Sequence, residues 1–200
     1  MSILPQQDPS MNIAPNEKQQ KPKSVRKEIL SWFLTIAAAV IIALVVRTYL
    51  FEPIRVDGES MTDTLQNGEL MFVTKPEYIW GSPSRQDIII CRYPNRKEYF
   101  VKRLIALPGD TIEIKYDQEK DTNTVYVNGE AVDESFLTKS RNSGNHTMAP
   151  VTLKDDEYFV MGDNRNNSND SRYVGALHRN QIVGHVRLVF YPFNTARAVQ

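Results

Sequence analysis

The most apolar stretch of this 200-residue chain lies near its N-terminus. Residues 29–46 carry no charge, and only Ser31 and Thr35 among them are polar. As a helix, these residues would rise about 27 Å, close to the hydrocarbon thickness of a bilayer. A buried core helix is usually shorter and keeps a polar stripe, and a cleaved signal peptide would end in a small-residue site where this chain continues with Arg47. The pattern predicts an uncleaved transmembrane helix over residues 28–50.

The segments on either side of this apolar stretch predict its orientation. Residues 1–27 are rich in Pro, Gln, Asn and Lys and too poor in apolar side chains to offset the entropy of ordering, so we expect a disordered tail. Only two basic residues, Arg47 and Arg55, follow the apolar stretch within about 20 residues, fewer than precede it. Because basic residues stay on the cytoplasmic side, we expect the tail inside the cell and the chain from residue 48 onward outside it. The basic residues that precede the stretch are more numerous: Lys18, Lys21, Lys23, Arg26 and Lys27.

Beyond residue 50, short hydrophobic or alternating runs replace the long apolar one. Each is short enough for a β-strand, and turn-forming pairs such as Asn67-Gly68 separate them. Residues 125–132 predict a hairpin, because Asn128-Gly129 at their centre is typical of a type I′ turn. The runs cover residues 54–56, 70–74, 87–92, 99–105, 111–115, 124–127, 158–161 and 183–190.

These runs indicate the fold class. No segment with helical periodicity is long enough to alternate with the strands, which argues against a parallel α/β fold. We therefore expect residues 51–200 to form a mostly β domain, an antiparallel barrel or sandwich, tethered by one N-terminal transmembrane helix. Residues 117–156 are polar, and we expect a less regular insertion there.

Composition narrows the classes of function. The chain has 24 Lys and Arg against 24 Asp and Glu, so its net charge is zero, which argues against holding nucleic acid by bulk electrostatics. The single cysteine, Cys91, excludes an internal disulfide, and three scattered histidines show no metal-ligand spacing. The net charge of zero is the sum of a charge of +3 over residues 1–47 and a charge of −3 over residues 48–200. This division agrees with the expected orientation across a membrane.

Two residues are candidates for nucleophilic catalysis. Ser60 follows a strand-like run, and Gly58 before it permits a turn or a close approach, although a serine in a glycine-containing loop is common. In the run that ends at residue 105, Phe100, Lys102 and Leu104 point to the same face. Burial between two apolar neighbours would lower the pKa of Lys102, as a general base requires. The commoner alternative is an edge-strand lysine that reaches solvent.

A third feature is the polar stretch over residues 161–172. It holds two aspartates, two arginines, two serines and four asparagines. Calcium loops place oxygen ligands at every second residue, whereas Arg165 and Arg172 oppose cation binding here. We interpret the stretch as a hydrogen-bonded, ion-paired loop that supports a neighbouring site.

These segments together resemble the bacterial type I signal peptidases. The segments that carry the resemblance are Ser60-Met61 with Leu65, Tyr99–Asp110, and Gly162–Arg172 with Gly175, in the order of the family and after a single N-terminal anchor. The resemblance covers roughly residues 25–192. It implies a membrane-bound serine endopeptidase that removes N-terminal signal peptides from secreted preproteins, cuts after small residues and needs no cofactor.

The resemblance also assigns a role to each matching position. Ser60 matches the nucleophile and Lys102 the general base. Ser168 matches a serine that orients the lysine. The backbone N–H of Ser60 matches an oxyanion-hole donor, and Gly58 stands where some members carry a second donor, a serine. The ion pairs of the family fall on Asp163 with Arg103 and on Asp170 with Arg172.

The chain departs from the family pattern at two positions near these residues. Asp63 stands where the family usually has proline, which removes a rigid turn residue and adds a negative charge near the cleft. Ala106 replaces a frequent glycine before Leu107. Neither change touches Ser60 or Lys102, so they affect local rigidity.

The resemblance places the protein in a bacterial plasma membrane, with a thylakoid membrane as the alternative, and makes secreted preproteins and membrane lipid its partners, without nucleic acid or metal. Self-cleaving repressors use similar dyad chemistry on a similar β-fold, but they carry a DNA-binding domain in place of an anchor. A tethered β-domain that only binds a partner would not need Ser60 and Lys102.

Overall fold

The computed structural model describes residues 25–45, 51–75, 78, 81–94, 96 and 98–199, with no account of the side chains of residues 51 and 52. Most of the expected tail, and the last five residues of the expected transmembrane segment, lie outside these residues. Helix α1 (Val25–Val45) begins three residues earlier than expected. Arg26, Lys27 and Glu28 favour helical backbone intrinsically, so the helix extends beyond its apolar part.

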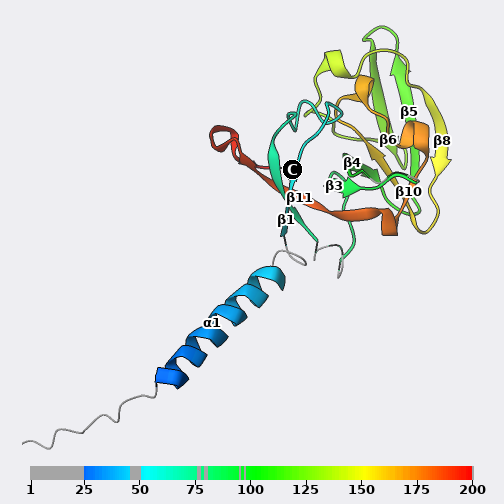
Figure 1. Ribbon diagram of the computed structural model, residues 1–200. Coiled ribbons are helices and arrows are strands. Elements are labelled where there is room, and N and C mark those ends of the chain that lie inside the picture. Colours follow the sequence, from blue (N-terminus) through cyan, green and yellow to red (C-terminus); the bar gives the residue numbers. More distant parts are fainter. Residues whose placement is uncertain are drawn as a thin grey trace, which may run out of the picture. The chain divides into compact units, whose positions relative to one another are not determined.

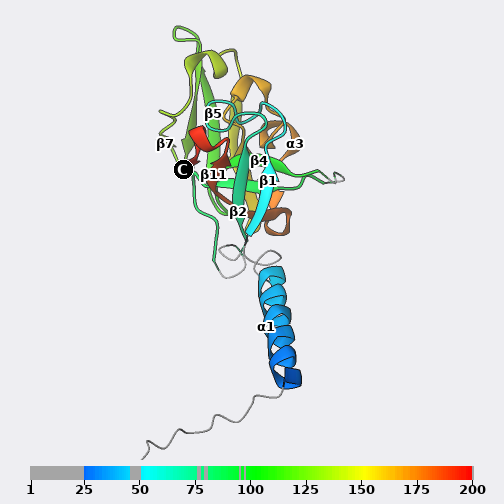
Figure 2. The same ribbon diagram turned by 60° about the vertical axis from the view of Figure 1, so that its left-hand side comes forward.

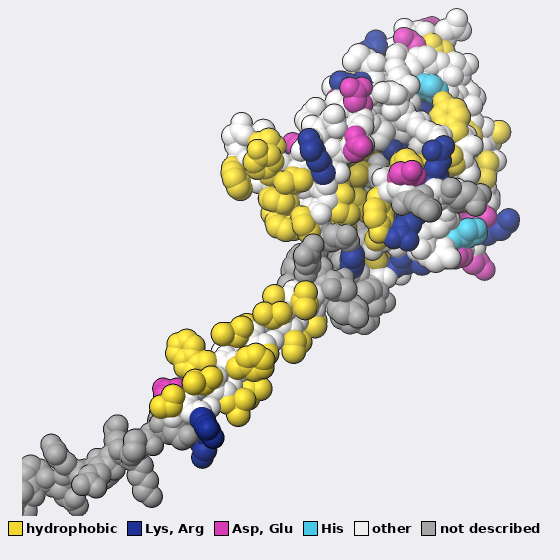
Figure 3. Space-filling model, viewed as in Figure 1, with side chains coloured by type: hydrophobic (Ala, Val, Ile, Leu, Met, Phe, Trp, Pro, Cys, Tyr) yellow, Lys and Arg dark blue, Asp and Glu magenta, His cyan; other side chains and the backbone are white. Residues whose placement is uncertain are grey.

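No residue of α1 is buried, and hydrophobic side chains cover the face of the helix seen in Figure 3. Charged side chains gather at its N-terminal end (Figure 3). The helix is long and apolar enough to cross a membrane. It therefore fits a membrane anchor.

The rest of the described chain is mostly β, as the sequence predicts, and every strand pairing in it is antiparallel (Figures 1 and 2). The larger sheet has the order β1-β2-β11-β3-β4-β9-β10, with β12 paired to β11. Its strands are β1 (Phe51–Arg55), β2 (Leu70–Thr74), β3 (Ile88–Cys91), β4 (Phe100–Ala106), β9 (Glu157–Met161), β10 (Leu177–His178), β11 (Ile182–Tyr191) and β12 (Arg197–Ala198). Helix α3 (Ser171–Val174) lies between β9 and β10 in the chain.

The second sheet has the order β7-β6-β5-β8. Its strands are β5 (Thr111–Asp117), β6 (Thr122–Val127), β7 (Glu130–Ala131) and β8 (Met148–Thr152). The predicted hairpin is present, since Asn128 and Gly129 have φ values of 54° and 84° between β6 and β7. The two sheets share a hydrophobic cluster in which side chains of β4 and β9 pack against side chains of β5 and β6.

The structure differs from the expected irregular insertion over residues 117–156. Three strands of the second sheet lie in it, β6, β7 and β8, and the residues of β6 alternate between buried and partly buried positions. Between β7 and β8 the chain is irregular apart from one short 3₁₀ helix, η2 (Lys139–Arg141). The polar composition correctly indicated the irregular connection between β7 and β8, but it did not indicate the strands on either side of it.

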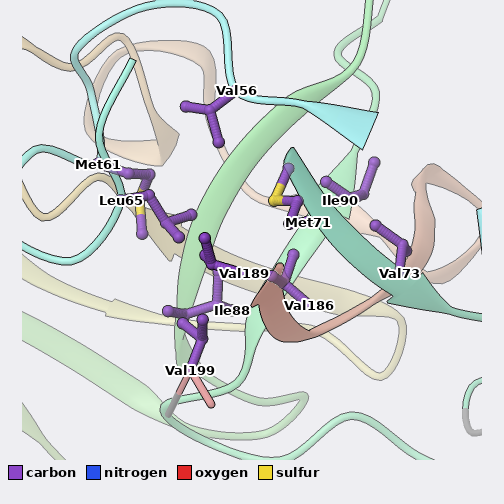
Figure 4. Close-up of a cluster of buried hydrophobic side chains, with 10 residues drawn as sticks. All are labelled: Val56, Met61, Leu65, Met71, Val73, Ile88, Ile90, Val186, Val189 and Val199. Atoms are coloured by element: carbon purple, nitrogen blue, oxygen red, sulfur yellow. The ribbon is translucent and has the colours of Figure 1, made fainter. Parts of the chain in front are cut away.

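The cluster beneath the larger sheet also fixes the loop after β1. Met61 and Leu65, which are 2% and 0% exposed, point from this loop into a cluster with Val56, Met71 and Ile88 (Figure 4). The loop is thereby anchored on the sheet, although it has no strand or long helix of its own.

Candidate active site

Ser60 lies in the turn that Met61 and Leu65 anchor. The backbone N–H of Leu65 donates to Met61 O at 2.8 Å, which closes one turn directly after the serine. Gly58 has a φ of 101°, a conformation that favours glycine, and its N–H donates to Asn67 Oδ1 at 3.2 Å. The turn and the glycine together fix the position of Ser60 in the loop that follows β1.

Lys102 lies on β4, directly across from Ile89 of β3. Leu104 belongs to the buried cluster on this face, and Phe100 packs against the same cluster, as the alternation predicts. The lysine is 2% exposed, which excludes the solvent-reaching alternative. Its Nζ lies 2.6 Å from Ser60 Oγ. The structure thus brings together the two residues singled out by the sequence, which lie 42 positions apart.

Burial lowers the pKa of Lys102 below its usual value. The negative charges of Asp170 and Asp163 oppose this shift, as Cys91 would only if it were a thiolate, but burial outweighs them. Among the residues that the structure describes, no carboxylate forms an ion pair with Lys102. The amine is therefore biased towards its neutral form, in which it can accept a proton.

The polar loop after β9 packs on the backbone of the serine. Asn164 donates its backbone N–H to Ser60 O at 3.0 Å and its side-chain Nδ2 to Glu59 O at 3.1 Å. Gly162 permits this approach, because a Cβ atom at that position would collide with Ser60 O and with Ser168 Oγ. The expected role of this loop as a support for a neighbouring site thus has a direct structural basis.

Both ion pairs expected for this site are present. Arg103 donates from Nε and Nη2 to the two carboxylate oxygens of Asp163, at 2.9 and 2.8 Å, and both side chains are buried. Arg172 donates from Nε and Nη2 to Asp170, both at 2.8 Å. Asp170 also accepts the N–H of Gly162 at 3.0 Å. Burial would raise the pKa of Asp170, but the hydrogen bonds and charge of Arg172 outweigh it and lower the pKa.

Ser168 differs from the expectation. Its hydroxyl is buried against Gly162 but makes no hydrogen bond to Lys102, and it has no geometrically acceptable partner within the described part of the chain. The backbone of Ser168 is extended. The structure therefore places the residue beside the site without the orienting contact.

Three contacts near the site had no signal in the sequence. Arg165, which is 1% exposed, donates Nε to Gly162 O at 2.9 Å, and its Nη2 lies 2.5 Å from Glu134 Oε1. The ring of Phe136 lies 3.9 Å from the Arg103 guanidinium carbon. Glu134 and Phe136 come from the connection between β7 and β8, which carries no recognisable motif.

A cavity of about 520 Å³ lies beside the serine. Its walls are formed by residues 54–58, at the end of β1 and just beyond it, and by residues 98–101, before and at the start of β4, with Ser60 and Met61 among the lining residues. No described residue accepts a hydrogen bond from the backbone N–H of Ser60. Within the described residues, no cluster of His, Cys, Asp and Glu is arranged to hold a metal ion.

Comparison with known proteins gives consistent matches. Residues 29–191 match the family model described as signal peptidase, peptidase S26. Signal peptidase I S of Bacillus subtilis (strain 168) is 41% identical over 183 residues, covering 87% of this chain and 95% of that protein. Signal peptidase I P of Bacillus subtilis subsp. natto is 40% identical over 88% of this chain and 97% of that protein.

Two further matches come from other genera. Signal peptidase IB of Staphylococcus aureus (strain COL) is 34% identical over 85% of this chain and 93% of that protein. A crystal structure of a signal peptidase I from Enterococcus faecalis V583 is 32% identical, with a TM-score of 0.40, and the match covers 52% of this chain and 96% of that chain.

Proposed function

The chain belongs to the signal peptidase I family of serine endopeptidases, and from that premise we propose that it cleaves signal peptides from secreted preproteins with Ser60 as nucleophile and Lys102 as general base. The observation that carries this assignment is the 2.6 Å contact between Ser60 Oγ and Lys102 Nζ. A serine hydroxyl is a weak nucleophile until a neighbouring base takes its proton. Lys102 is the base within reach, and its burial favours the neutral amine.

The reaction proceeds through an acyl-enzyme. Neutral Lys102 accepts the proton of Ser60 Oγ as this oxygen attacks the scissile carbonyl carbon. The resulting ammonium then gives a proton to the leaving amine as the carbon–nitrogen bond breaks, which leaves the signal peptide esterified to Ser60. A water molecule attacks the ester and passes a proton to Lys102, and the release of Ser60 with that proton restores the starting state.

The backbone N–H of Ser60 supports oxyanion stabilisation. It has no acceptor among the described residues, so it is available to the negative oxygen of a tetrahedral intermediate. Gly58 supplies no hydroxyl that would act as a second side-chain donor. Two ion pairs support the site, Arg103 with Asp163 and Arg172 with Asp170, by fixing the loop that packs on Ser60 and the strand that carries Lys102.

The cavity suits an extended substrate. Residues 54–58 and 98–101 form its walls, so a peptide between them lies beside β1 and the start of β4 and bonds to them as an added strand. The serine among the lining residues then faces the scissile bond. We assign to this cavity the segment of the preprotein that precedes the cut, with small residues nearest Ser60.

Helix α1 anchors the enzyme as a single membrane span, with the N-terminus in the cytoplasm and the β-domain outside. The excess of basic residues before the apolar stretch supports this orientation. A bacterial plasma membrane is the expected location, with a thylakoid membrane as the alternative. Anchoring keeps the enzyme on the membrane from which signal peptides emerge, so the substrate and the lipid are both partners of the enzyme.

Cleavage of a preprotein by the purified full chain in detergent micelles tests the catalytic assignment. Ser60→Ala and Lys102→Ala are each expected to lower kcat/KM by at least about 10³-fold. Lys115→Ala is the matched control, because this lysine is 57% exposed and pairs with Glu113 on the second sheet. Wild-type turnover by Lys102→Ala would exclude the dyad.

The orientation has a separate test. Cys91 is buried, so a cysteine introduced at an exposed position is the thiol that reacts with a membrane-impermeant maleimide. Asn180→Cys, on the β-domain, is expected to react in intact cells, and Ser10→Cys only after lysis. The opposite pattern would reverse the proposed topology.

A further inference from the structure

The connection between β7 and β8 crosses behind the candidate active site. We call residues 134–143 of it the 134–143 segment. Besides the contacts of Glu134 and Phe136 described above, this segment accepts hydrogen bonds from Asn166 Nδ2 at Ser140 O (3.2 Å) and at Ser143 Oγ (2.9 Å). It therefore touches both the polar loop after β9 and Arg103, the neighbour of Lys102 on β4.

Asp63 joins the same segment to the turn that carries the nucleophile. It lies three residues after Ser60, and its side chain is 10% exposed. Its Oδ2 accepts hydrogen bonds from both the backbone N–H and the hydroxyl of Thr138, each at 3.0 Å. Its Oδ1 forms an ion pair with Arg141 Nε at 3.0 Å. One carboxylate thus makes three contacts with the 134–143 segment.

The backbone at Asp63 has a conformation that its residue type rarely adopts. Its φ is 114°, which favours glycine and is strained for a residue with a Cβ atom. A strained residue persists where surrounding contacts hold it in place, and the three contacts of the carboxylate do so here. Proline, with a φ near −65°, cannot occupy this backbone unchanged.

Asn164 bonds to Ser60 O, and the Thr64 hydroxyl donates to Asp163 and accepts from Arg103. Two further sets of contacts hold the turn that begins at Ser60. On one side, Met61 and Leu65 are buried in the cluster beneath the larger sheet (Figure 4). On the other, Asp63 holds the turn through polar contacts to Thr138 and Arg141. Directional bonds to a carboxylate restrict the orientation of the turn more than apolar packing alone does.

We propose that Asp63 is a positioning residue that orients Ser60 towards Lys102 by clamping the nucleophile turn to the 134–143 segment. The proposal rests on the proposed function, since it concerns the attack of Ser60. The clamp keeps Ser60 Oγ in reach of Lys102 Nζ as the substrate enters the cavity. Its loss lowers the rate of acylation and leaves substrate binding nearly intact, because Asp63 itself does not line the cavity.

Asp121 offers a matched control. It too is an aspartate with positive φ (49°), and its Oδ1 accepts the N–H of Gly144 at 2.9 Å and the hydroxyl of Tyr116 at 2.8 Å. It therefore ties down the chain just beyond the 134–143 segment by the same kind of contact. It does not touch the nucleophile turn.

Steady-state cleavage by the full chain in detergent compares these two aspartates. Asp63→Ala is expected to lower kcat roughly tenfold with KM within about twofold, at a temperature well below the melting temperature of each variant. Asp121→Ala is expected to keep kcat within about twofold of the wild type. A merely structural role would lower the melting temperature of both variants and leave kcat of the folded enzyme unchanged. Wild-type kcat in Asp63→Ala, or an equal loss in Asp121→Ala, would overturn the proposal.

Two further substitutions separate the carboxylate from the backbone. Asp63→Gly removes the clamp but adopts the φ of 114° without strain, so an equal fall in kcat is expected if the carboxylate is responsible. Recovery of wild-type kcat in Asp63→Gly would contradict the clamp. Arg141→Lys is expected to retain more kcat than Arg141→Ala, because a lysine can restore part of the ion pair.

Hydrogen exchange makes the clamp testable without turnover. The N–H of Thr138 is bonded to Asp63, and the N–H of Leu65 closes the nucleophile turn. Both amides are expected to exchange faster in Asp63→Ala than in the wild type and in Asp121→Ala. Unchanged exchange would overturn the clamp, whereas absence of cleavage by the wild type would overturn the proposed function and leave the exchange result valid.

Discussion

Lys102 and Arg103 are consecutive cations on β4 with opposite surroundings. Each is 2% exposed, and they lie on opposite faces of the strand, across from Ile89 and Ile88 respectively. Arg103 meets the carboxylate of Asp163 through two hydrogen bonds. Lys102 meets the neutral hydroxyl of Ser60 and forms no ion pair with any described carboxylate.

The difference follows from the chemistry of the two side chains. A guanidinium stays charged at any ordinary pH, so its burial requires an anion with matching geometry, which Asp163 supplies. An amine can lose its proton, so a buried lysine without an anion becomes neutral more easily. One face of β4 thus carries a fixed charge that organises the loops, and the other carries a base.

The largest effect is expected when this difference is removed at Lys102. Lys102→Arg puts a permanent charge where the reaction needs a neutral base, so kcat/KM is expected to fall by at least about 10³-fold. Arg103→Lys keeps a cation beside Asp163, and its kcat/KM is expected to fall far less. Steady-state cleavage of one preprotein by both variants measures the contrast. Comparable losses in the two variants would mean that the faces do not have separate roles.

Removal of the anion from the other face is expected to change stability. Asp163→Ala leaves the buried charge of Arg103 without an anion, and such a loss typically costs about 3–5 kcal/mol of the free energy of unfolding. The double variant Asp163→Ala/Arg103→Met removes the charge as well and is expected to be more stable than Asp163→Ala alone. Denaturant unfolding of the full chain in detergent tests this order, and a double variant no more stable than the single one would contradict it.

The sequence alone predicted the contrast on β4 only in part. The alternation of Phe100, Lys102 and Leu104 placed the lysine on an apolar face, because that pattern is local to one strand. The likeness to a family suggested the partners Ser60 and Asp163, which lie 42 and 60 positions away from the side chains that they bind. No local pattern encodes such distances.

Contacts from the irregular part of the chain were beyond such reasoning. The substitution at Asp63 was visible in the sequence, but its partners Thr138 and Arg141 lie about 75 positions further on, in a segment that follows no period. Glu134 and Phe136 likewise act through long-range packing against Arg165 and Arg103. Their positions depend on how the second sheet packs against the first, which no short motif determines.

A smaller effect concerns the dependence of stability on pH. Burial lowers the pKa of Lys102 in the folded state below the ordinary value that it has in the unfolded chain. Between these two values the unfolded chain binds more protons, so stability rises with pH across that window and is reduced below it. Lys102→Met removes this dependence. At neutral pH its free energy of unfolding is expected to exceed that of the wild type by about 1 kcal/mol, which corresponds to a Tm higher by roughly 2–4 °C.

Thermal unfolding of the two proteins across this range of pH measures the effect. Their melting temperatures are expected to converge as the pH rises towards the ordinary pKa of lysine. Lys115→Met is the control, because the side chain that it replaces is exposed. A difference between wild type and Lys102→Met that grows with pH would reverse the sign and show that the folded protein stabilises the ammonium.

The smallest effect is expected at Cys91, and it tests whether Lys102 truly lacks an anion. Cys91 packs in the same cluster as Leu104, and burial raises the pKa of its thiol to about 12, with Lys102 opposing the rise. A protonated thiol gives the lysine no negative partner. Cys91→Ala is therefore expected to leave the acidic limb of the kcat/KM against pH profile in place. A limb that moved to lower pH would mean that a thiolate had been raising the pKa of Lys102, so both cations of β4 would be ion-paired and the contrast between its faces would be lost.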